Sequence, residues 1–254
     1  MKIATLLAAL MSLTIIARAE DLKPSADDAG FKPLFNGKDL TGWDGDTSFW
    51  KAEDGMIVGE TTAENPIKHA NTFLIAQDDG KDLKVSDFEF RVQWRFAPDR
   101  PFGNSGIQYR SHRVNDPKNP ENKWIVGGYQ ADCDKDNQYT GICYEERGRG
   151  IFCKFGKKMT VNSSGKKEET GDTATMAELT TARKAAGEWN DYVVICKGNH
   201  CVQILNGVVV ADFTDDQPGK SAKSGILALQ IHQGKPMRVE FKDPKIKTLG
   251  ETRK

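Results

Sequence analysis

Residues 87–112 read DFEFRVQWRFAPDRPFGNSGIQYRSH, and this stretch decides the fold. Phe88–Phe96 alternates apolar and polar residues, and such a period of two predicts a strand that packs one face on a core. After a Pro/Gly loop the alternation resumes, with Ile107 and Tyr109 on the core side. The opposite face carries Gln108, Arg110 and His112. These side chains indicate that the outward face of the sheet binds a ligand. The alternative is that it is the ordinary solvated face of an antiparallel sheet.

The rest of the chain repeats this pattern in shorter pieces. Turn signals such as Asp54-Gly55 and Asn206-Gly207 separate apolar runs at short intervals, and helical periodicity is almost absent. The sequence therefore predicts an all-β fold, a two-sheet antiparallel sandwich. Lys154–Lys184 lacks clear periodicity, and we expect a long excursion with at most a short helix.

The N-terminus has the form of a secretory signal. Lys2 precedes an apolar run over 3–16, and Ala17-Arg18-Ala19 forms a small-x-small cleavage site. The run is too short to span a bilayer, so we expect a secreted or periplasmic protein without a membrane span. The expected segments are a signal peptide at 1–19, a loose leader at 20–30, one domain at 31–248 and a frayed tail at 249–254.

Charge and missing motifs narrow the function. Lys and Arg total 36, as do Asp and Glu, and removing Lys2 and Arg18 with the signal leaves a slight acidic excess. This balance predicts neither nucleic acid nor an anionic membrane as partner. The sequence has no Gly-x-Ser-x-Gly, His-Glu-x-x-His, P-loop or dinucleotide motif. It also lacks a Glu-x-Asp-x-x-Glu strand, which disfavours classical two-carboxylate glycoside hydrolysis.

The five cysteines indicate structural roles. Cys196 and Cys201 flank Lys-Gly-Asn-His, a predicted hairpin turn across which the two could pair in an exported protein. Cys133, Cys143 and Cys153 fall ten residues apart, which is not a zinc-ligand spacing. We therefore predict no metal site and no catalytic role for these thiols.

Planar polar side chains occupy the alternate positions of three predicted strands that face away from the core. They are Gln108, Arg110 and His112 on one strand, Gln130 and Asp132 on a second, and Gln230 and His232 on a third. Paired donors and acceptors of this kind suit a polyhydroxylated ligand, so a carbohydrate is the expected partner. Glu145 and Glu146 beside Arg147 and Arg149 are either a catalytic acid–base group or a surface ion-pair cluster.

Ordered motifs along the chain resemble a known family. The motifs include LFNGKDLTGW ending at Trp43, GNSGI ending at Ile107, GYQAD ending at Asp132, CYEE ending at Glu146, and GEWN ending at Asn190. Together they resemble the 3-keto-disaccharide hydrolase domain family over about residues 30–248. The resemblance implies a concanavalin-like jelly roll and cleavage of glycosides that are already oxidised at C3.

The implied chemistry needs a base, a stabiliser for an enolate oxygen and an acid for the leaving group. A C3 ketone acidifies the C2 proton; its removal expels the C1 substituent by β-elimination, and water adds to the enone. As hypotheses, Glu145 or His232 is the base, Arg110 with Gln130 holds the enolate, and Asp132 orients His232 or binds hydroxyls. The remaining substrate-binding candidates are Gln108, Tyr144, Arg149 and Gln230.

The sequence leaves two questions open, namely whether a metal takes part and whether the protein is an enzyme at all. A divalent metal on the ketone is one option, with His232, Asp132 and Glu145 as conceivable ligands, but no ligand spacing demands it. The alternative to an enzyme is a non-catalytic, lectin-like carbohydrate-binding module, because the same jelly roll serves both enzymes and sugar-binding domains.

Overall fold

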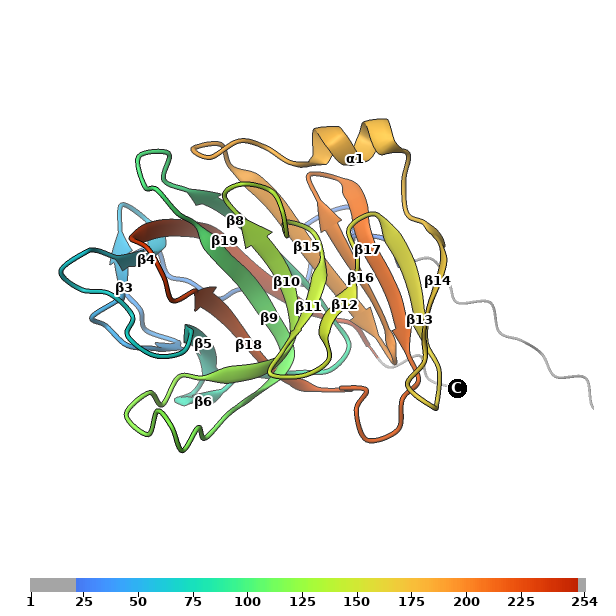
Figure 1. The fold of residues 1–254 in the computed structure, drawn as a ribbon, viewed down its shortest axis with the longest axis horizontal. Helices are drawn as coiled ribbons and strands as arrows, with labels where there is room; N and C mark the ends of the chain where they lie inside the picture. The colour runs from blue at the N-terminus through green and yellow to red at the C-terminus, as the bar shows by residue number, and fades with distance from the viewer. Residues whose placement is uncertain (1–21, 251–254) are drawn as a thin grey trace, which may run out of the picture.

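The computed structural model describes residues 22–250 as a sandwich of two sheets stacked face to face (Figure 1). The predicted signal peptide at 1–19 lies outside the described residues. Antiparallel pairing dominates both sheets, and the predicted all-β sandwich is confirmed. Within the described part of the chain, no helix has the length and apolar content needed to cross a bilayer.

One layer, sheet A, has ten strands. Its order is β14 (Lys167–Asp172), β13 (Lys157–Val161), β17 (Val208–Asp215), β16 (His200–Leu205), β15 (Asn190–Lys197), β8 (Phe88–Phe96), β19 (Met237–Thr248), β4 (Met56–Thr61) and β3 (Trp50–Glu53), with β1 (Lys32–Pro33) on β19. The pairing of β13 with β17 is parallel.

The other layer, sheet B, has nine strands. Its order is β12 (Gly150–Cys153), β11 (Cys143–Glu146), β10 (Val126–Asp134), β9 (Asn104–Arg113), β18 (Gly225–Ile231), β5 (Thr72–Asp78) and β2 (Trp43–Asp44), with β6 (Lys81–Asp82) on β5 and β7 (Lys84–Val85) on β18.

The stretch 87–112 supplies an inner strand to each layer. β8 lies between β15 and β19 in sheet A, and β9 lies between β10 and β18 in sheet B. The apolar residues of β8 alternate into the core, as do Ile107 and Tyr109 of β9. The alternation that predicts the strands therefore also places the core between them.

Part of the expected leader is hydrogen-bonded to sheet A, through Ser25 and Asp28. Ser25 donates from its backbone N and its Oγ to Glu89 Oε2, at 2.9 and 2.7 Å. Arg91 donates to the Ser25 carbonyl oxygen at 2.5 Å. Glu89 on β8 is only 1% exposed because this segment covers it. A buried carboxylate needs such hydrogen bonds, so the segment completes the outer face of sheet A.

The segment 154–184 is more regular than expected. It forms β13, β14 and a short helix, α1 (Met176–Ala182), which lies at the rim of the sandwich (Figure 1). Thr175 and Glu178 make a capping box that starts the helix. The expected hairpin at Gly198 is present, and its two cysteines, Cys196 and Cys201, form a disulfide.

Candidate active site

A pocket of about 440 Å³ lies on the face of sheet B that points away from the core. We call it the main pocket. The lining residues come from five strands and adjoining loops: Asn71, Asn104, Gln130, Asp132, Tyr139, Tyr144, Glu146, Ile151, Gln230 and His232. Five of these, Gln130, Asp132, Tyr144, Gln230 and His232, are among the site residues predicted from the sequence.

Strand parity explains why these side chains converge. On β10, Tyr129, Ala131 and Cys133 belong to the core, so Gln130 and Asp132 point outward. On β18, the core residues Leu227, Leu229 and Ile231 leave Gln230 facing outward, with His232 just beyond the strand end. β9 lies between these two strands, so the sheet brings both sets together as predicted.

Two carboxyl groups in the main pocket have raised pKa values. Burial raises the pKa of Asp132 well above its usual value, and the nearby charges of Asp134 and Glu146 raise it further. Burial also raises the pKa of Glu146, although Arg147 and hydrogen bonds from Asn71 and Gln230 oppose the change. A raised carboxyl pKa keeps the proton on the group toward neutral pH, which suits a proton donor.

Amide side chains surround these acids. Gln108 is buried beneath the pocket and donates to Gln130 Oε1 at 2.8 Å, which fixes the Gln130 amide. Gln230 Nε2 donates to Glu146 Oε2 at 3.3 Å. Asp132 Oδ1 and Gln230 Oε1 are buried without a hydrogen-bond partner among the described residues. Unpaired buried acceptors are costly, so a ligand that brings hydroxyl donors would satisfy them.

His232 is oriented by its neighbours. Its Nδ1 lies 2.5 Å from the Gln233 carbonyl oxygen, which can only accept, so Nδ1 carries the proton. In the neutral ring Nε2 is then the basic nitrogen. Gln233 N in turn donates to Asn71 Oδ1 at 3.1 Å. Phe102 packs edge-on against the ring, with centroids 6.1 Å apart.

The pocket also has an apolar lip. Tyr139 and Ile151 are 43% and 48% exposed, and they are two of the three large apolar residues that the described chain exposes. Both line the main pocket beside Tyr144. Apolar side chains next to polar ones match the two faces of a sugar ring.

Arg110 is not in the main pocket, and a bulge is the reason. Between the pairs Gln108–Ala228 and Ser111–Ile226, β9 has one residue more than β18. Arg110 occupies this irregularity with φ +46°. A bulge reverses the alternation of side chains, so the predicted parity no longer holds beyond Tyr109.

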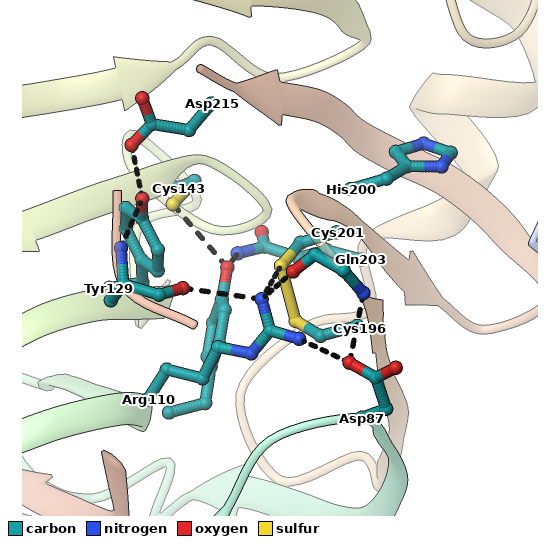
Figure 2. Close-up of a disulfide and its surroundings, with 12 residues drawn as sticks. Asp87, Arg110, Tyr129, Cys143, Cys196, His200, Cys201, Gln203 and Asp215 are labelled. Carbon is teal, nitrogen blue, oxygen red and sulfur yellow. Dashed lines mark hydrogen bonds and ion pairs between the residues drawn. A yellow bond between two sulfur atoms is a disulfide. The ribbon is translucent and has the colours of Figure 1, made fainter. Parts of the chain in front are cut away.

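Arg110 instead anchors the loops beside the Cys196–Cys201 disulfide (Figure 2). Its guanidinium donates to the carbonyl oxygens of Ser86 and Gly198, both at 2.7 Å, and of Ala222 at 3.2 Å. It also pairs with Asp87 at 3.0 Å. The enolate-binding role predicted for Arg110 is therefore not supported by its position. His112 is exposed and does not line the main pocket either.

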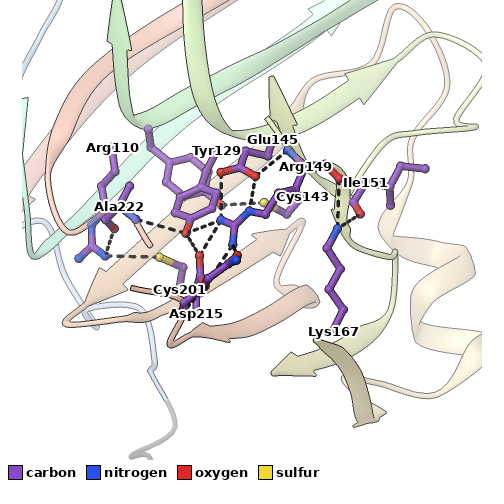
Figure 3. Close-up of polar contacts among 12 residues, drawn as sticks. Arg110, Tyr129, Cys143, Glu145, Arg149, Ile151, Lys167, Cys201, Asp215 and Ala222 are labelled. Carbon is purple, nitrogen blue, oxygen red and sulfur yellow. Dashed lines mark hydrogen bonds and ion pairs between the residues drawn. The ribbon is translucent and has the colours of Figure 1, made fainter. Parts of the chain in front are cut away.

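Glu145 and Arg149 pair with each other between the sheets (Figure 3). Arg149 Nε lies 2.5 Å from Glu145 Oε2, and its Nη2 lies 2.7 Å from Asp215 Oδ2. Adjacent strand residues face opposite ways, so Glu146 lines the pocket and Glu145 does not. Glu146 has the same parity as Tyr144, and this is the signal that identifies it as a pocket residue. It was named with Glu145 as a possible acid–base group, but only Glu145 was chosen as a predicted site residue.

The conceivable metal ligands do not form a set. His232 and Asp132 line the main pocket, while Glu145 is bound to Arg149. Within residues 22–250, no group of three or more His, Cys, Asp or Glu side chains is placed to hold a metal ion. We therefore assign no residue a metal-binding role.

Gly106 on β9 makes room for Gln130. A Cβ at this position would lie 2.5 Å from Gln130 Cγ. We expect Gly106→Ala to displace the Gln130 amide and lower kcat/KM about tenfold to a hundredfold, since small displacements of positioning groups have effects of this size. Gly171→Ala on β14 is the matched control, because nothing lies within 4 Å of the added Cβ. Steady-state kinetics of both variants check this, and equal activity would contradict it.

Comparison with solved structures agrees with the fold. A protein described as a candidate glycosyl hydrolase from Parabacteroides distasonis ATCC 8503 matches with TM-score 0.52 and 23% identity, over 87% of this chain and 94% of that one. The carbohydrate-binding module CBM66 from Bacillus subtilis matches with TM-score 0.50 and 12% identity, over 82% and 96%. At such identities the likeness shows the fold alone.

Comparison with curated protein sequences gives no match. The model of one domain family does match, and it covers residues 30–247, nearly all of the described chain. This agrees with the resemblance drawn from the ordered motifs. The chain belongs to the 3-keto-alpha-glucoside-1,2-lyase-like domain family.

Proposed function

We propose that the protein cleaves 3-keto-glycosides by elimination across C1 and C2. The observation that carries this proposal is the main pocket, which combines a basic imidazole nitrogen with two carboxyl groups of raised pKa. Four amide side chains around them offer partners for sugar hydroxyls. The family description supports a lyase reaction on α-glucosides.

The first step removes the C2 proton. His232 Nε2 accepts this proton, and the C–H electrons form an enolate whose negative charge lies on the C3 oxygen. Asp132, kept neutral by its raised pKa, donates its proton in a hydrogen bond to that oxygen, with the Gln130 amide as a second donor. A buried neutral carboxylic acid stabilises an enolate well because its dipole is already in place.

The second step breaks the glycosidic bond. The enolate electrons re-form the C3 carbonyl and a C1–C2 double bond, while the C1–O bond electrons leave with the aglycone oxygen. Glu146 gives this oxygen its proton, so an alcohol and an enone result. Addition of water to the enone would then return a 3-keto sugar, with hydrolysis as the net outcome.

A carbohydrate-binding module without turnover is the second candidate function. The fold match to CBM66 and the exposed Tyr139 and Ile151 on the pocket lip favour it. The buried acids distinguish the two proposals. A site that only binds neutral sugars has no need of carboxyl groups that stay protonated toward neutral pH, whereas acid catalysis requires such groups.

We also propose export, since the Cys196–Cys201 disulfide is typical of oxidising compartments.

A paired assay tests the proposal. The protein is incubated with methyl 3-keto-α-glucoside and with unoxidised methyl α-glucoside, each with and without EDTA. We expect loss of the keto substrate alone, with an enone or a 3-keto sugar as product by mass spectrometry. EDTA reports whether a metal takes part. Binding of either sugar without cleavage would contradict the enzymatic proposal and support the binding module.

A further inference from the structure

Cys143 and Cys153 are free thiols on two neighbouring strands, β11 and β12. They are direct partners in the antiparallel register of these strands. Directly opposed residues of an antiparallel pair have Cα atoms about 4.5–5.5 Å apart, and a disulfide joins residues whose Cα atoms are about 4.4–6.8 Å apart. The backbone therefore holds the two cysteines at the separation that a disulfide needs.

Both side chains point to the same side of sheet B. Cys143 and Cys153 are 0% exposed and belong to the core. The register shifts between Cys143 and Tyr144, where β12 has one extra residue, Phe152. Phe152 also belongs to the core, so this bulge lets consecutive residues of β12 face inward. Burial raises the pKa of the Cys143 thiol well above its usual value, and the charge of Cys153 raises it further, so the two sulfur atoms interact.

The chain already contains one disulfide with the same register. Cys196 and Cys201 are direct partners on β15 and β16, and they are bonded, with Cα atoms 4.2 Å apart. Three of the five cysteines are free. Cys133 is the odd one, since its partner on β9 is Ser105. The export proposed above would bring the remaining opposed pair into an oxidising compartment, where such thiols form disulfides.

We propose that Cys143 and Cys153 are a site of oxidative modification, at which a disulfide oxidant joins them into a second cross-strand disulfide. One thiolate attacks a sulfur of the oxidant and expels one oxidant thiol. The other thiolate then attacks the mixed disulfide at the cysteine sulfur and expels the second oxidant thiol. The two cysteines lose two protons and two electrons in total, and one oxidant disulfide is reduced to two thiols. The proposal is independent of the cleavage reaction.

Strand β12 provides access to the buried thiols. It ends sheet B and neighbours only β11 among the described strands of that sheet. An edge strand of four residues opens locally at low cost. Burial raises the pKa of Cys153 to about 12, so the closed strand protects this thiol. The oxidation therefore takes place during folding or when β12 opens.

The new bond would close the hairpin that carries part of the main pocket. Tyr144 and Glu146 on β11 and Ile151 on β12 line that pocket. A cross-link beside Tyr144 restricts the opening of the hairpin and so stabilises this wall of the pocket.

Mapping of the cysteines tests the proposal. The full chain is refolded in a mixture of reduced and oxidised glutathione, unfolded again with N-ethylmaleimide, and digested for mass spectrometry. We expect the label on Cys133 alone and a peptide pair joined through Cys143 and Cys153. Label on all three free cysteines, or a bond that includes Cys133, would overturn the proposal.

Thermal unfolding gives a second readout. Reduction by dithiothreitol breaks the Cys196–Cys201 bond in the wild type and in Cys153→Ser alike, so the difference between the two proteins isolates the second bond. We expect reduction to lower the melting temperature of the wild type by about 4 °C or more beyond its effect on Cys153→Ser. Cys133→Ser is the matched control, because it removes another buried thiol and should respond to reduction as the wild type does. Equal effects of reduction on the wild type and on Cys153→Ser would overturn the proposal.

Discussion

Replacing Glu146 by Gln is expected to lower kcat about a hundredfold to a thousandfold, with a much smaller effect on KM. The amide keeps the size of the side chain and its contact with Gln230 but cannot donate a carboxyl proton to the departing oxygen. Loss of a general acid typically has an effect of this order. Steady-state kinetics on a 3-keto-glycoside measure it.

Glu145→Gln is the matched control, one residue away and on the opposite face of β11. It should keep most of the activity and instead lower the melting temperature, because Glu145 pairs with the half-buried Arg149. The opposite result, an inactive Glu145→Gln beside an active Glu146→Gln, would contradict the assignment.

The dependence of kcat on pH should also identify Glu146 as the proton donor. Burial raises the pKa of Glu146, so the protonated, active form persists to a higher pH than for a solvated Glu. Activity should therefore fall as pH rises through this raised pKa. In Glu146→Gln this fall should be lost, and the decrease that remains should follow the ionisation of Asp132, whose pKa burial raises well above its usual value. A profile of kcat against pH for both proteins checks this.

Replacing Asp132 by Asn is expected to remove most activity and yet stabilise the fold at neutral pH. Burial raises the folded-state pKa of Asp132 well above that of the unfolded chain. Between the two pKa values the folded state binds more protons, so the free energy of unfolding of the wild type falls as pH rises. Asn at 132 should therefore raise the free energy of unfolding at pH 7, because it removes the cost of ionising a buried carboxyl group.

The gain should shrink as pH falls, and it should vanish below about pH 4, where Asp132 is protonated in both states. Denaturant unfolding of both proteins over this pH range measures the gain.

Asp134→Asn is the control. Asp134 is equally buried, but its carboxylate accepts from the backbone N of Gln138, Tyr139 and Thr140 at 2.9, 2.7 and 2.7 Å. Asn at 134 should destabilise by about 2 kcal/mol. Destabilisation by Asn at both positions would contradict the account of Asp132.

Much of the fold could be predicted from strand periodicity. The alternation in 87–112 identifies β8, β9 and the side of each that meets the core. The same parity placed Gln130, Asp132, Gln230 and His232 on one surface, and the structure brings these four together in the main pocket. A period of two carries this information because side-chain direction follows it wherever a strand is regular.

Parity fails where a strand is irregular. The bulge in β9 turns Arg110 toward the loops beside the disulfide, and no residue type in GNSGIQYRSH signals the extra residue. Glu145 was preferred to its neighbour Glu146 although Tyr144 shares its parity with Glu146. Asn71, Tyr139 and Ile151 join the pocket from the strand ends and loops, whose position depends on tertiary contacts rather than on periodicity.

The segment 20–30 shows that composition alone does not predict tertiary contacts. Residues 20–30 are polar and carry a proline, which is typical of a flexible segment. Within this segment, Ser25 donates two hydrogen bonds to Glu89, a buried charged residue near the start of β8. A buried acid in the outer face of a strand is recognisable only once the covering segment is in place.

The central claim is that cleavage proceeds through loss of the C2 proton, and a reaction in D₂O tests it most directly. A 3-keto-α-glucoside with ordinary hydrogen at C2 is cleaved in D₂O, and the C2 position of the released sugar is analysed by mass spectrometry and NMR. A sample without protein corrects for spontaneous exchange beside the ketone. Elimination predicts an enone without C2 hydrogen, or a 3-keto sugar that carries one deuterium at C2 after solvent addition. A released 3-keto sugar that keeps its original C2 hydrogen would contradict elimination and indicate direct displacement at C1.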